Sequence, residues 1–572
     1  MNNEKKQIIL NWLKQQEETD SLTQEQRDIF ALIRESLHTK KYGLVFEEKE
    51  EDIVNEANNS ILTLKQKDLI IANNNTKELN YLLEGDNYQA LKLLQKTHRN
   101  RIDVIYIDPP YNTGNKDFIY NDHFVDLDDG FRHSKWLSFM KKRLELAKTL
   151  LNENGVIFIS IDDRELFQIK LLFDEIFSET NFIACLPRIL KKGGKTTGTF
   201  SKEHDYVLIY SKSENMNFNK KELSEADALE KSKYFFDDKH PERGYYKLTQ
   251  CLDYDSLQWS ESMDFEIDIN GEKFYPGGSF DKYLDRKKGI HKRNDWVWRW
   301  SQQLVDFGIK NDLIVIKRTK NGSRLYTKTY LNTKISKNGR EYFFEKQQKL
   351  MNYSSLEFIE NKYSNDYANK ELNKIFDAKV FDYPKPLSLI YDLIKIHSMH
   401  NSIILDFFAG SGTTGHAVAK LNADDGGNRT YILCTNNENN ICENVTFKRL
   451  SNIQGELPHS LIYQQIETIN KDEFIGSNYD QKYLDQLEES SKQLAQLELG
   501  KLIDNKEIFF ITSQDELENA NEDDLLNATV IFMNENKVDP YRSKVYDHIK
   551  NKIIIIPDNY YEKELKETDY LW

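Results

Sequence analysis

The four residues Asp108-Pro109-Pro110-Tyr111 have the composition of a site that activates an aromatic amine. Such an amine is a poor nucleophile because its lone pair is delocalised into the ring, so well-placed acceptors must hold its N–H groups. Asp108 offers a carboxylate, and the carbonyl of Pro109 has a fixed direction because Pro110 restricts the residue before it. Tyr111 adds a flat face on which an extruded ring can stack. We therefore predict that these four residues are catalytic and act on an exocyclic amine.

The elements around this motif alternate between strand and helix. The patterns predict strands at 79–84, 103–107 and 155–161, and helices at 87–97 and 135–151. Asp108 directly follows the β-branched run 103–107, which is typical of a strand buried on both faces. This alternation predicts an α/β fold with a mostly parallel sheet and helices on both faces. The chemistry requires no metal, and no cysteine or histidine group has the spacing of metal ligands.

A second strand–helix–strand segment lies far downstream, with strands at 402–406 and 430–434 and a helix at 413–421. Between the first strand and the helix stands Phe408-Ala409-Gly410-Ser411-Gly412, an F-x-G-x-G turn. Its glycines let the backbone approach a ligand closely. A phosphate loop is excluded because His416-Ala417 stands where Lys-Ser/Thr is needed. The simplest architecture is one α/β domain interrupted by an insertion.

Changes in composition divide the chain into five regions. We expect an N-terminal helical region (1–70), the catalytic half of the α/β domain (71–185), the insertion (186–375), the half with the glycine turn (376–454) and an acidic α/β region (455–572).

The distribution of charge points to nucleic acid, although the net charge of the chain is −15. Residues 282–340 hold 16 Lys/Arg and 4 Asp/Glu, a net of +12, whereas residues 456–572 hold 12 and 25, a net of −13. A basic block inside an acidic chain is typical of a phosphate-binding segment. The predicted DNA contacts are Lys192, Lys195, Lys288, Lys292, Arg293, Lys317, Arg318, Lys320 and Arg324. The alternation Trp296-Val297-Trp298-Arg299-Trp300 favours one core-facing side of a strand over a base-stacking platform.

The sequence resembles the amino-methyltransferases of DNA, whose (D/N/S)PP(Y/F/W) motif matches residues 108–111. The Asp form is usually associated with adenine N6 and the Ser form with cytosine N4. The resemblance therefore implies a Rossmann-like, S-adenosylmethionine-dependent enzyme that methylates adenine N6 in double-stranded DNA by base flipping. The cofactor contacts that it implies are Asp86, Asn87, Lys385, Asp406, Phe408, Gly410, Gly412 and Glu438. Two roles stay open: Lys385 could meet the methionine carboxylate or lie on the surface, and Asp406 could orient the turn instead.

The order of the motifs implies a subgroup. The catalytic motif precedes the insertion and the glycine turn follows it, which is the permuted order called β among these enzymes; the insertion is then the target-recognition domain. The resemblance covers about residues 40–450 and is closest to modification (Mod) subunits of type III restriction-modification systems, through segments 42–46, 82–87, 107–114 and 381–386. It implies a homodimer and a restriction (helicase-nuclease) subunit as a further partner.

Several alternatives stay open. They are an orphan DNA adenine methyltransferase, an enzyme acting on cytosine N4 and, from a different class, a DNA-binding specificity subunit with an idle core. RNA is less favoured because no RNA-module pattern is present. The first twenty residues lack the apolar core of a signal peptide, and no apolar run is long enough to span a bilayer. We therefore expect a cytoplasmic protein without membrane contact.

Overall fold

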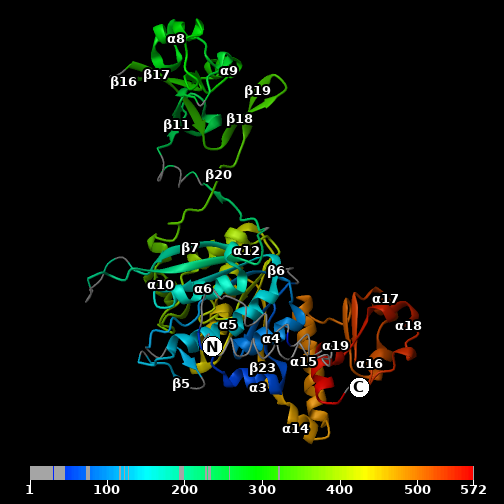
Figure 1. Ribbon diagram of the computed structural model, residues 1–572. Helices are drawn as coiled ribbons and strands as arrows, with labels where there is room; N and C mark the ends of the chain where they lie inside the picture. The colour runs from blue at the N-terminus through cyan, green and yellow to red at the C-terminus, as the bar shows by residue number, and fades with distance from the viewer. Residues whose placement is uncertain are drawn as a thin grey trace, which may run out of the picture. The chain divides into compact units, whose positions relative to one another are not determined.

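The chain forms two compact units (Figure 1), one made of residues 1–219 and 354–572 and the other of residues 220–353. The computed structural model describes residues 30, 46–72, 78–114, 118–120, 123–126, 128–191, 193, 199–214, 216–223, 225, 229, 233–256, 258–319 and 322–570. The second unit is shorter than the predicted insertion, 186–375, because both ends of that range belong to the first unit.

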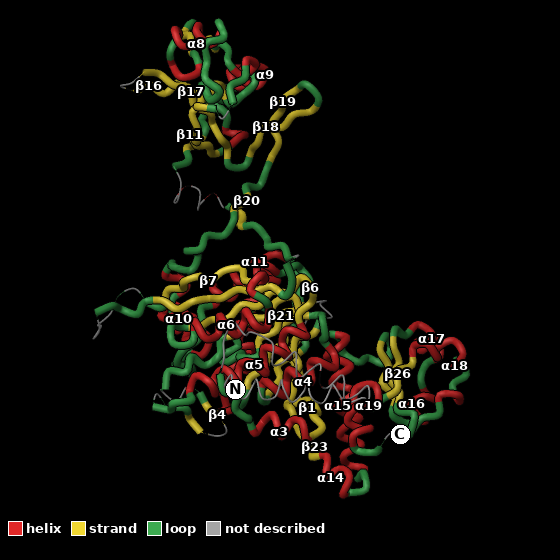
Figure 2. Tube along the Cα trace, in the orientation of Figure 1, coloured by secondary structure: helices red, strands yellow, loops and turns green. Residues whose placement is uncertain are grey.

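A nine-stranded sheet organises the first unit, in the order β1-β23-β2-β22-β21-β3-β6-β8-β7 (Figure 2). Its strands are β1 (Ser60–Ile70), β2 (Leu79–Glu84), β3 (Ile102–Ile107), β6 (Leu151–Ile161), β7 (Phe182–Ile189), β8 (His204–Ser211), β21 (Ile403–Asp406), β22 (Thr430–Thr435) and β23 (Ser460–Asn470). The strands from β23 to β6 pair in parallel, and the other pairs are antiparallel. The predicted mostly parallel sheet is confirmed.

Helices cover both faces of this sheet. They are α4 (Asn87–Thr97), α5 (Arg132–Leu150), α6 (Leu166–Phe177), α11 (Leu387–His397) and α12 (Thr413–Asp425). Alternate side chains of β22 show the two faces: Ile432 and Cys434 share a core with α4, α5 and α6, whereas Tyr431 and Leu433 lie against Gly415 of α12. Helix α11 packs on α12. The sheet is therefore the middle layer of three, which explains why its central strands β3, β21 and β22 are mostly apolar.

The N-terminal region differs from the helical prediction for residues 1–70. After α3 (Asp52–Asn59), residues 60–70 form β1, which pairs with β23 from Ser60–Asn470 to Ile70–Leu461. Ile61 and Leu64 are buried there. Their partner strand comes from the other end of the chain, so local spacing could not reveal the pairing. The helices predicted within residues 1–45 lie outside the described residues, apart from Phe30.

The described part of the second unit consists mainly of short antiparallel strands, with the helices α8 and α9. Its largest sheet has the order β10-β11-β17-β16, and Leu252, Trp298, Val305 and Leu325 form its core. The bounds are β9 (Lys221–Glu222), β10 (Phe235–Phe236), β11 (Tyr245–Cys251), β12 (Asp253–Asp255), β13 (Ile267–Ile269), β14 (Glu272–Phe274), α8 (Phe280–Lys287), β15 (Trp296–Trp298), α9 (Gln302–Lys310), β16 (Ile314–Thr319), β17 (Gly322–Tyr330), β18 (Thr333–Asn338), β19 (Glu341–Lys346) and β20 (Leu350–Met351).

The acidic C-terminal region is continuous with the first unit, in contrast to the separate region expected for 455–572. Strand β23 lies inside the sheet between β1 and β2, and α15 (Gln481–Leu499) packs against β1. A further parallel sheet follows, made of β24 (Ile508–Ile511), β25 (Val530–Met533) and β26 (Ile553–Ile555). The remaining helices are α10 (Asn365–Phe376), α13 (Lys448–Asn452), α14 (Lys471–Gly476), α16 (Gln514–Asn519), α17 (Glu522–Asn527), α18 (Tyr546–Ile549) and α19 (Asp558–Glu567).

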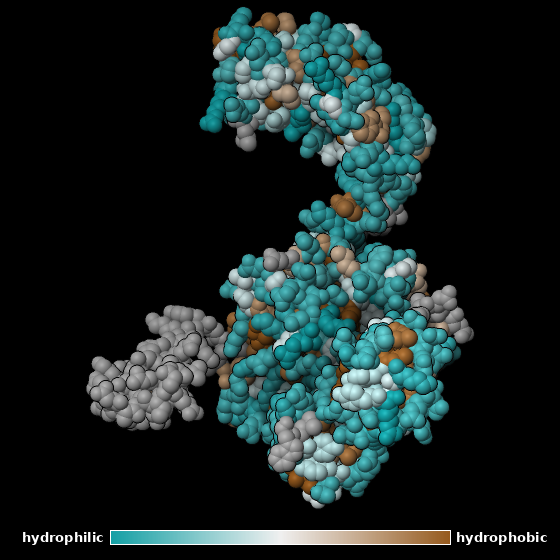
Figure 3. Space-filling model, turned by 90° about the vertical axis from the view of Figure 1, so that its right-hand side faces the viewer, coloured by the Kyte–Doolittle hydropathy of each residue, from teal (hydrophilic) through white to brown (hydrophobic). Residues whose placement is uncertain are grey.

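Within the described ranges, no helix combines the length and the apolar character needed to cross a membrane. The face of the molecule drawn in Figure 3 is largely hydrophilic, with scattered apolar patches.

We expect Gly415→Ala to destabilise the protein by about 1–3 kcal/mol, the range for overpacking a filled core. A Cβ at Gly415 would come within 2.8 Å of Leu450 and 3.1 Å of Leu433, which outweighs the ~1 kcal/mol that alanine normally gains over glycine in a helix. Gly476→Ala is the matched control, since a Cβ there meets no atom of the described residues within 4 Å. Urea unfolding of both variants measures the effect, and equal midpoints would contradict it.

Candidate active site

The carboxyl ends of β2, β22, β21, β3 and β6 meet at one edge of the sheet because these strands are parallel. The Asp108-Pro109-Pro110-Tyr111 motif follows β3, and the F-x-G-x-G turn at 408–412 follows β21. These two strands are direct neighbours, with Leu405 paired to Ile105. From β21 the chain continues through α12 to β22, whereas from β3 it continues through α5 to β6 on the other side. Such a change of direction opens a crevice at the strand ends, where ligands bind in this class of fold.

Asp108 lies in this crevice beside Lys385, with 2.6 Å between the lysine Nζ and Oδ1 of the carboxylate. The contact is an ion pair without hydrogen-bond alignment: Oδ1 is buried and accepts no hydrogen bond from any described residue. An acceptor left open in a buried place is costly unless a ligand completes it. Asp108 therefore has the acceptor capacity that amine chemistry requires.

Polar contacts fix the rest of the catalytic motif. The indole Nε1 of Trp136 donates to the Pro110 carbonyl at 2.7 Å. The Tyr111 hydroxyl accepts from Lys385 Nζ at 3.0 Å and donates to Asp205 Oδ2 at 3.2 Å. Burial raises the pKa of Tyr111 well above its usual value, so the hydroxyl keeps its proton.

The segment after the motif is held by a buried carboxyl group. Asn112 adopts a left-handed φ of 54°, and its Nδ2 donates to Glu165 Oε1 at 2.6 Å. The imidazole Nδ1 of His133 lies 2.6 Å from the same oxygen. Burial raises the pKa of Glu165 to about 8, so this carboxyl group is mostly protonated at neutral pH.

The glycine turn has the backbone conformation that only glycine adopts readily. Gly410 and Gly412 have φ angles of 48° and 75°, and Gly412 is the N-cap of α12. The Thr446 hydroxyl donates to the Gly410 carbonyl at 2.5 Å, and a Cβ on Gly412 would lie 3.1 Å from the Thr446 methyl group. Thr446 thus holds the turn on one side, and the backbone of the turn stays open toward the crevice.

Asp406 orients the glycine turn. Its Oδ1 accepts from the Phe408 amide at 3.0 Å, and its Oδ2 accepts from the Thr414 hydroxyl at 2.5 Å. Burial raises the pKa of Asp406 to about 7. Of the two roles left open by the sequence, orientation of the turn is the one that these contacts support.

Asp86 and Asn87 lie at the end of β2 and start α4. Arg143, which the sequence analysis missed, supports both: its Nη2 donates to Asp86 Oδ1 at 3.3 Å, and its Nε donates to Asn87 Oδ1. Arg143 is only 1% exposed and also pairs with Glu51 at 2.8 Å. The sequence does contain a signal for this role: Arg143 occupies a position in the apolar stripe of α5, and a charge buried there needs a partner.

Arg143 also links the two cofactor motifs. Its guanidinium stacks 3.6 Å from the ring centroid of Phe139, and Phe139 lies 6.0 Å from the ring of Phe408. The acid after β2 and the aromatic residue of the glycine turn therefore share one support.

Two predicted cofactor residues lie elsewhere than expected. The Lys385 side chain, 11% exposed, contacts the catalytic motif, although its carbonyl accepts from Thr413 in the first turn of α12 at 3.3 Å. Glu438 is exposed on a short turn after β22. Lys385 thus contacts both motifs, whereas Glu438 is exposed.

The predicted DNA contacts divide into three groups. Lys192, Lys195 and Lys320 lie outside the described residues. Arg318 and Arg324 are partly neutralised, by Glu272 at 2.8 Å and by Asp253 at 2.9 Å. The exposed group is Lys288, Lys292, Arg293 and Lys317, and no acidic partner of these four occurs among the described residues.

The loop that carries Lys292 and Arg293 is braced by Trp259. The Trp259 amide donates to the Arg293 carbonyl at 2.7 Å, and its indole stacks on the His291 ring at 3.9 Å between centroids. As predicted, the tryptophan alternation serves the core, since Trp298 is 2% exposed and Trp300 packs against the same cluster.

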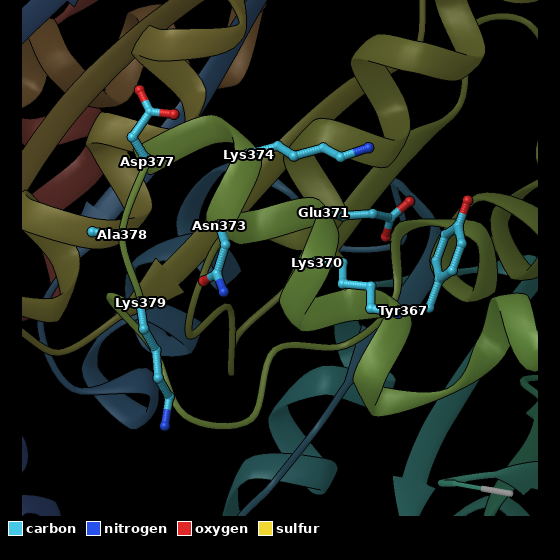
Figure 4. A pocket seen from close by; sticks show the side chains of 8 residues that line it. All are labelled: Tyr367, Lys370, Glu371, Asn373, Lys374, Asp377, Ala378 and Lys379. Carbon is cyan, nitrogen blue, oxygen red and sulfur yellow. The ribbon is translucent and has the colours of Figure 1, made fainter.

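A cavity of about 590 Å³ lies beside α10 and the segment that follows it. Glu371 at its wall accepts from the Leu387 amide at the start of α11 at 3.1 Å. The side chains of Lys374 and Lys379 point in different directions (Figure 4), so these cations do not converge on one ligand, and we assign none.

Comparison with known proteins places the chain in the DNA methylase family, whose pattern matches residues 102–489; the chain belongs to that family. It is similar to the EcoPI Mod subunit of a type III restriction-modification enzyme from Escherichia phage P1, with 33% identity over 64% of this chain and 58% of that protein. The StyLTI Mod subunit of Salmonella typhimurium is 31% identical over 67% of this chain and 57% of that protein.

A third relative, the type II methyltransferase M.KpnI of Klebsiella pneumoniae, is 33% identical over 64% of this chain and 84% of that protein. The chain therefore spans a little over half the length of the two Mod subunits and most of M.KpnI.

We expect the pH dependence of stability to show the raised pKa of Glu165. In the folded protein Glu165 keeps its proton to about pH 8, whereas the unfolded chain loses it near 4.5. Between these values the folded state binds more protons, so rising pH lowers the free energy of unfolding. Glu165→Gln removes this dependence, so the stability of the wild type relative to this variant should fall from about pH 5 to 8.

Urea unfolding at several pH values measures that difference. Glu214→Gln, at an exposed position, is the control and should leave the pH dependence unchanged. A wild-type curve parallel to that of Glu165→Gln would show that the carboxyl group is ionised throughout.

Proposed function

We propose that this protein transfers a methyl group from S-adenosylmethionine to adenine N6 in double-stranded DNA, as the modification and specificity subunit of a type III restriction-modification system. The observation that carries the proposal is the pairing of β3 with β21, which sets the open Asp108 acceptor beside the glycine turn. Membership of the DNA methylase family and the similarity to Mod subunits support it.

The residues of the crevice fit S-adenosylmethionine. Gly410 and Gly412 give the turn two positions without a side chain, and the Asp86 carboxylate, 31% exposed, is fixed by Arg143 after β2, two strands from β21. Phe408 offers an aromatic face that is only partly buried. When bound, the cofactor supplies an electrophilic methyl group on a positively charged sulfur.

The chain's own residues prepare the amine. In the proposed reaction, the Asp108 carboxylate accepts one N–H and the Pro109 carbonyl accepts the other, which turns the lone pair out of conjugation. Tyr111 stacks on the flipped base. Because positive charge develops on nitrogen as the new bond forms, the fixed negative charge of Asp108 stabilises the transition state. Correct positioning of both reactants contributes about 7–11 kcal/mol in favourable cases.

The substrate and partners rest on similarity. The Asp form of the motif supports adenine over cytosine N4. The relatives named as Mod subunits of type III restriction-modification enzymes support a restriction subunit as partner, whereas the 84% coverage of M.KpnI favours the second candidate, a methyltransferase that works without such a subunit. Co-purification with a helicase-nuclease chain separates these two. We also propose a homodimer. An idle core is disfavoured, because the catalytic motif and the glycine turn lie together with their supports in place.

DNA contacts in the second unit are proposed for Lys288, Lys292, Arg293 and Lys317, four of the exposed cations whose side chains have no acidic partner among the described residues. The brace from Trp259 holds the backbone of the 291–293 loop, which lowers the conformational cost of ordering its cations on phosphates.

We expect Asp108→Ala to lower the methylation rate at least ~100-fold, the usual effect of losing one preorganised group that stabilises transition-state charge. Single-molecule sequencing of DNA from cells that express the wild type should show N6-methyladenine in one short motif, and this mark should be absent with the variant. Glu214→Ala, at an exposed position of the same unit, is the control and is not expected to change the methylation rate. Methylation that survives Asp108→Ala would refute the mechanism.

We expect Lys292→Ala with Arg293→Ala to weaken DNA binding and to reduce the slope of log K against log salt by about 2, since each phosphate contact contributes about 0.9. Lys334→Ala is the control in the same unit, because Lys334 is already paired with Glu345 at 3.0 Å. Filter binding at several salt concentrations gives both slopes; an unchanged slope for the double variant would remove this loop from the interface.

A further inference from the structure

A fully buried ion pair stands behind the catalytic tyrosine. Arg188 on β7 and Asp205 on β8 are 1% and 0% exposed. The arginine Nε donates to Asp205 Oδ1 at 2.6 Å, and its Nη2 donates to Oδ2. The two bonds form the parallel, two-pronged arrangement that fixes the plane of a carboxylate.

The oriented carboxylate reaches the active site through one atom. Asp205 Oδ2 accepts from the Tyr111 hydroxyl at 3.2 Å, and that hydroxyl in turn accepts from Lys385 at 3.0 Å. Lys385 completes the chain at Asp108, 2.6 Å away. The tyrosine is therefore held at its hydroxyl from two sides, by a donor from the crevice and by an acceptor from the buried pair.

Stability alone does not account for such a pair. Buried ion pairs lose much of their attraction to desolvation, and apolar side chains of the same volume often serve a core equally well. Apolar side chains, however, cannot accept a hydrogen bond from the Tyr111 hydroxyl in a fixed direction. The pair is thus suited to orient the Tyr111 ring.

Arg188 has further contacts on the chain that returns from the second unit. Its Nη1 donates to the Tyr363 carbonyl at 3.2 Å and to Asn365 Oδ1 at 2.9 Å. The hairpin of β7 and β8 precedes the departure of the chain at residue 220, and Tyr363 and Asn365 follow its return at 353. One guanidinium therefore joins both ends of the insertion to the catalytic tyrosine.

We propose that Arg188 and Asp205 are positioning residues, which set the Tyr111 ring for stacking on the extruded base and tie that setting to the two chain segments that carry the insertion. The inference rests on the proposed function, because it assigns Tyr111 to the flipped base. Neither residue touches the reacting atoms.

The test is a double-mutant cycle between Asp205→Asn and Tyr111→Phe. Asp205→Asn should lower kcat by about 10- to 100-fold, since a hydrogen bond to a charged group contributes at that level. It should also lower the fluorescence gain of 2-aminopurine at the target position several-fold. The KM for the cofactor should stay unchanged. Tyr111→Phe keeps the ring but lacks the hydroxyl. In that background, Asp205→Asn should have little further effect, because the connection no longer exists.

His204→Ala is the matched control, at an exposed neighbouring position on β8, and should behave as the wild type. Independent, multiplicative effects of the two substitutions would overturn the proposal, because a merely structural loss does not depend on the tyrosine hydroxyl. If Asp205→Asn does not fold, Tyr111→Phe decides by itself, since unchanged kcat and fluorescence would show that the hydroxyl is not used. Wild-type protein that methylates no DNA would refute the proposed function, and this inference with it.

Discussion

The pairing of β3 with β21 is the contact on which the site depends. The two strands lie far apart in the chain, and each ends in a motif that is incomplete alone. Asp108 can hold an amine but has no methyl donor, and the 408–412 turn can cradle a cofactor but has no acceptor for a substrate. Because the strands are parallel neighbours and the chain leaves them toward opposite sides, their ends open on a shared crevice. The insertion between the motifs can therefore vary without moving the site.

Three buried arginines support this crevice from behind. Arg143 holds Asp86 and Asn87, and Arg188 holds Tyr111 through Asp205. Arg449, 1% exposed, donates to the hydroxyl groups of Ser411 and Thr413 at 3.2 and 2.8 Å.

A guanidinium presents several donors in a fixed plane, so each of these arginines can serve more than one partner at once. Burial lowers the pKa of Arg449 to about 10, which still leaves it charged at neutral pH. The acceptors of the site thus rest on a layer of buried arginine donors, an arrangement that limits reorganisation during reaction.

Local sequence was sufficient for the parts of the fold with strong periodicity. Strands β3, β6, β21 and β22 were predicted within a few residues because buried parallel strands are nearly continuous apolar runs, and motif spacing placed Asp108 and Gly410 at strand ends. The prediction was wrong where the structure of a segment depends on a partner far away in the sequence. Residues 60–70 form a strand only because β23 is there to pair with them. Arg318 and Arg324 stay predicted DNA contacts, and the acids that partly neutralise them, Glu272 and Asp253, also come from distant parts of the chain.

The position of Lys385 shows why spacing alone could not assign its role. An unpaired buried carboxylate is costly, and Lys385, with its Nζ 2.6 Å from Oδ1, is the partner of Asp108. Yet a cation so close to the amine opposes the positive charge that develops there in the proposed reaction.

The contacts around Lys385 resolve this conflict. Its backbone is held by Thr413, so only the side chain is free to withdraw. Tyr111 already offers it a second acceptor, and the negative charge of Asp205 stands behind that hydroxyl. In the proposed reaction, a base that reaches Asp108 displaces the ammonium toward the Tyr111 hydroxyl, where it keeps a hydrogen-bond acceptor. Tyr111 and Asp108 thus share Lys385, and in the proposed reaction the arriving amine takes the place of the lysine at Asp108.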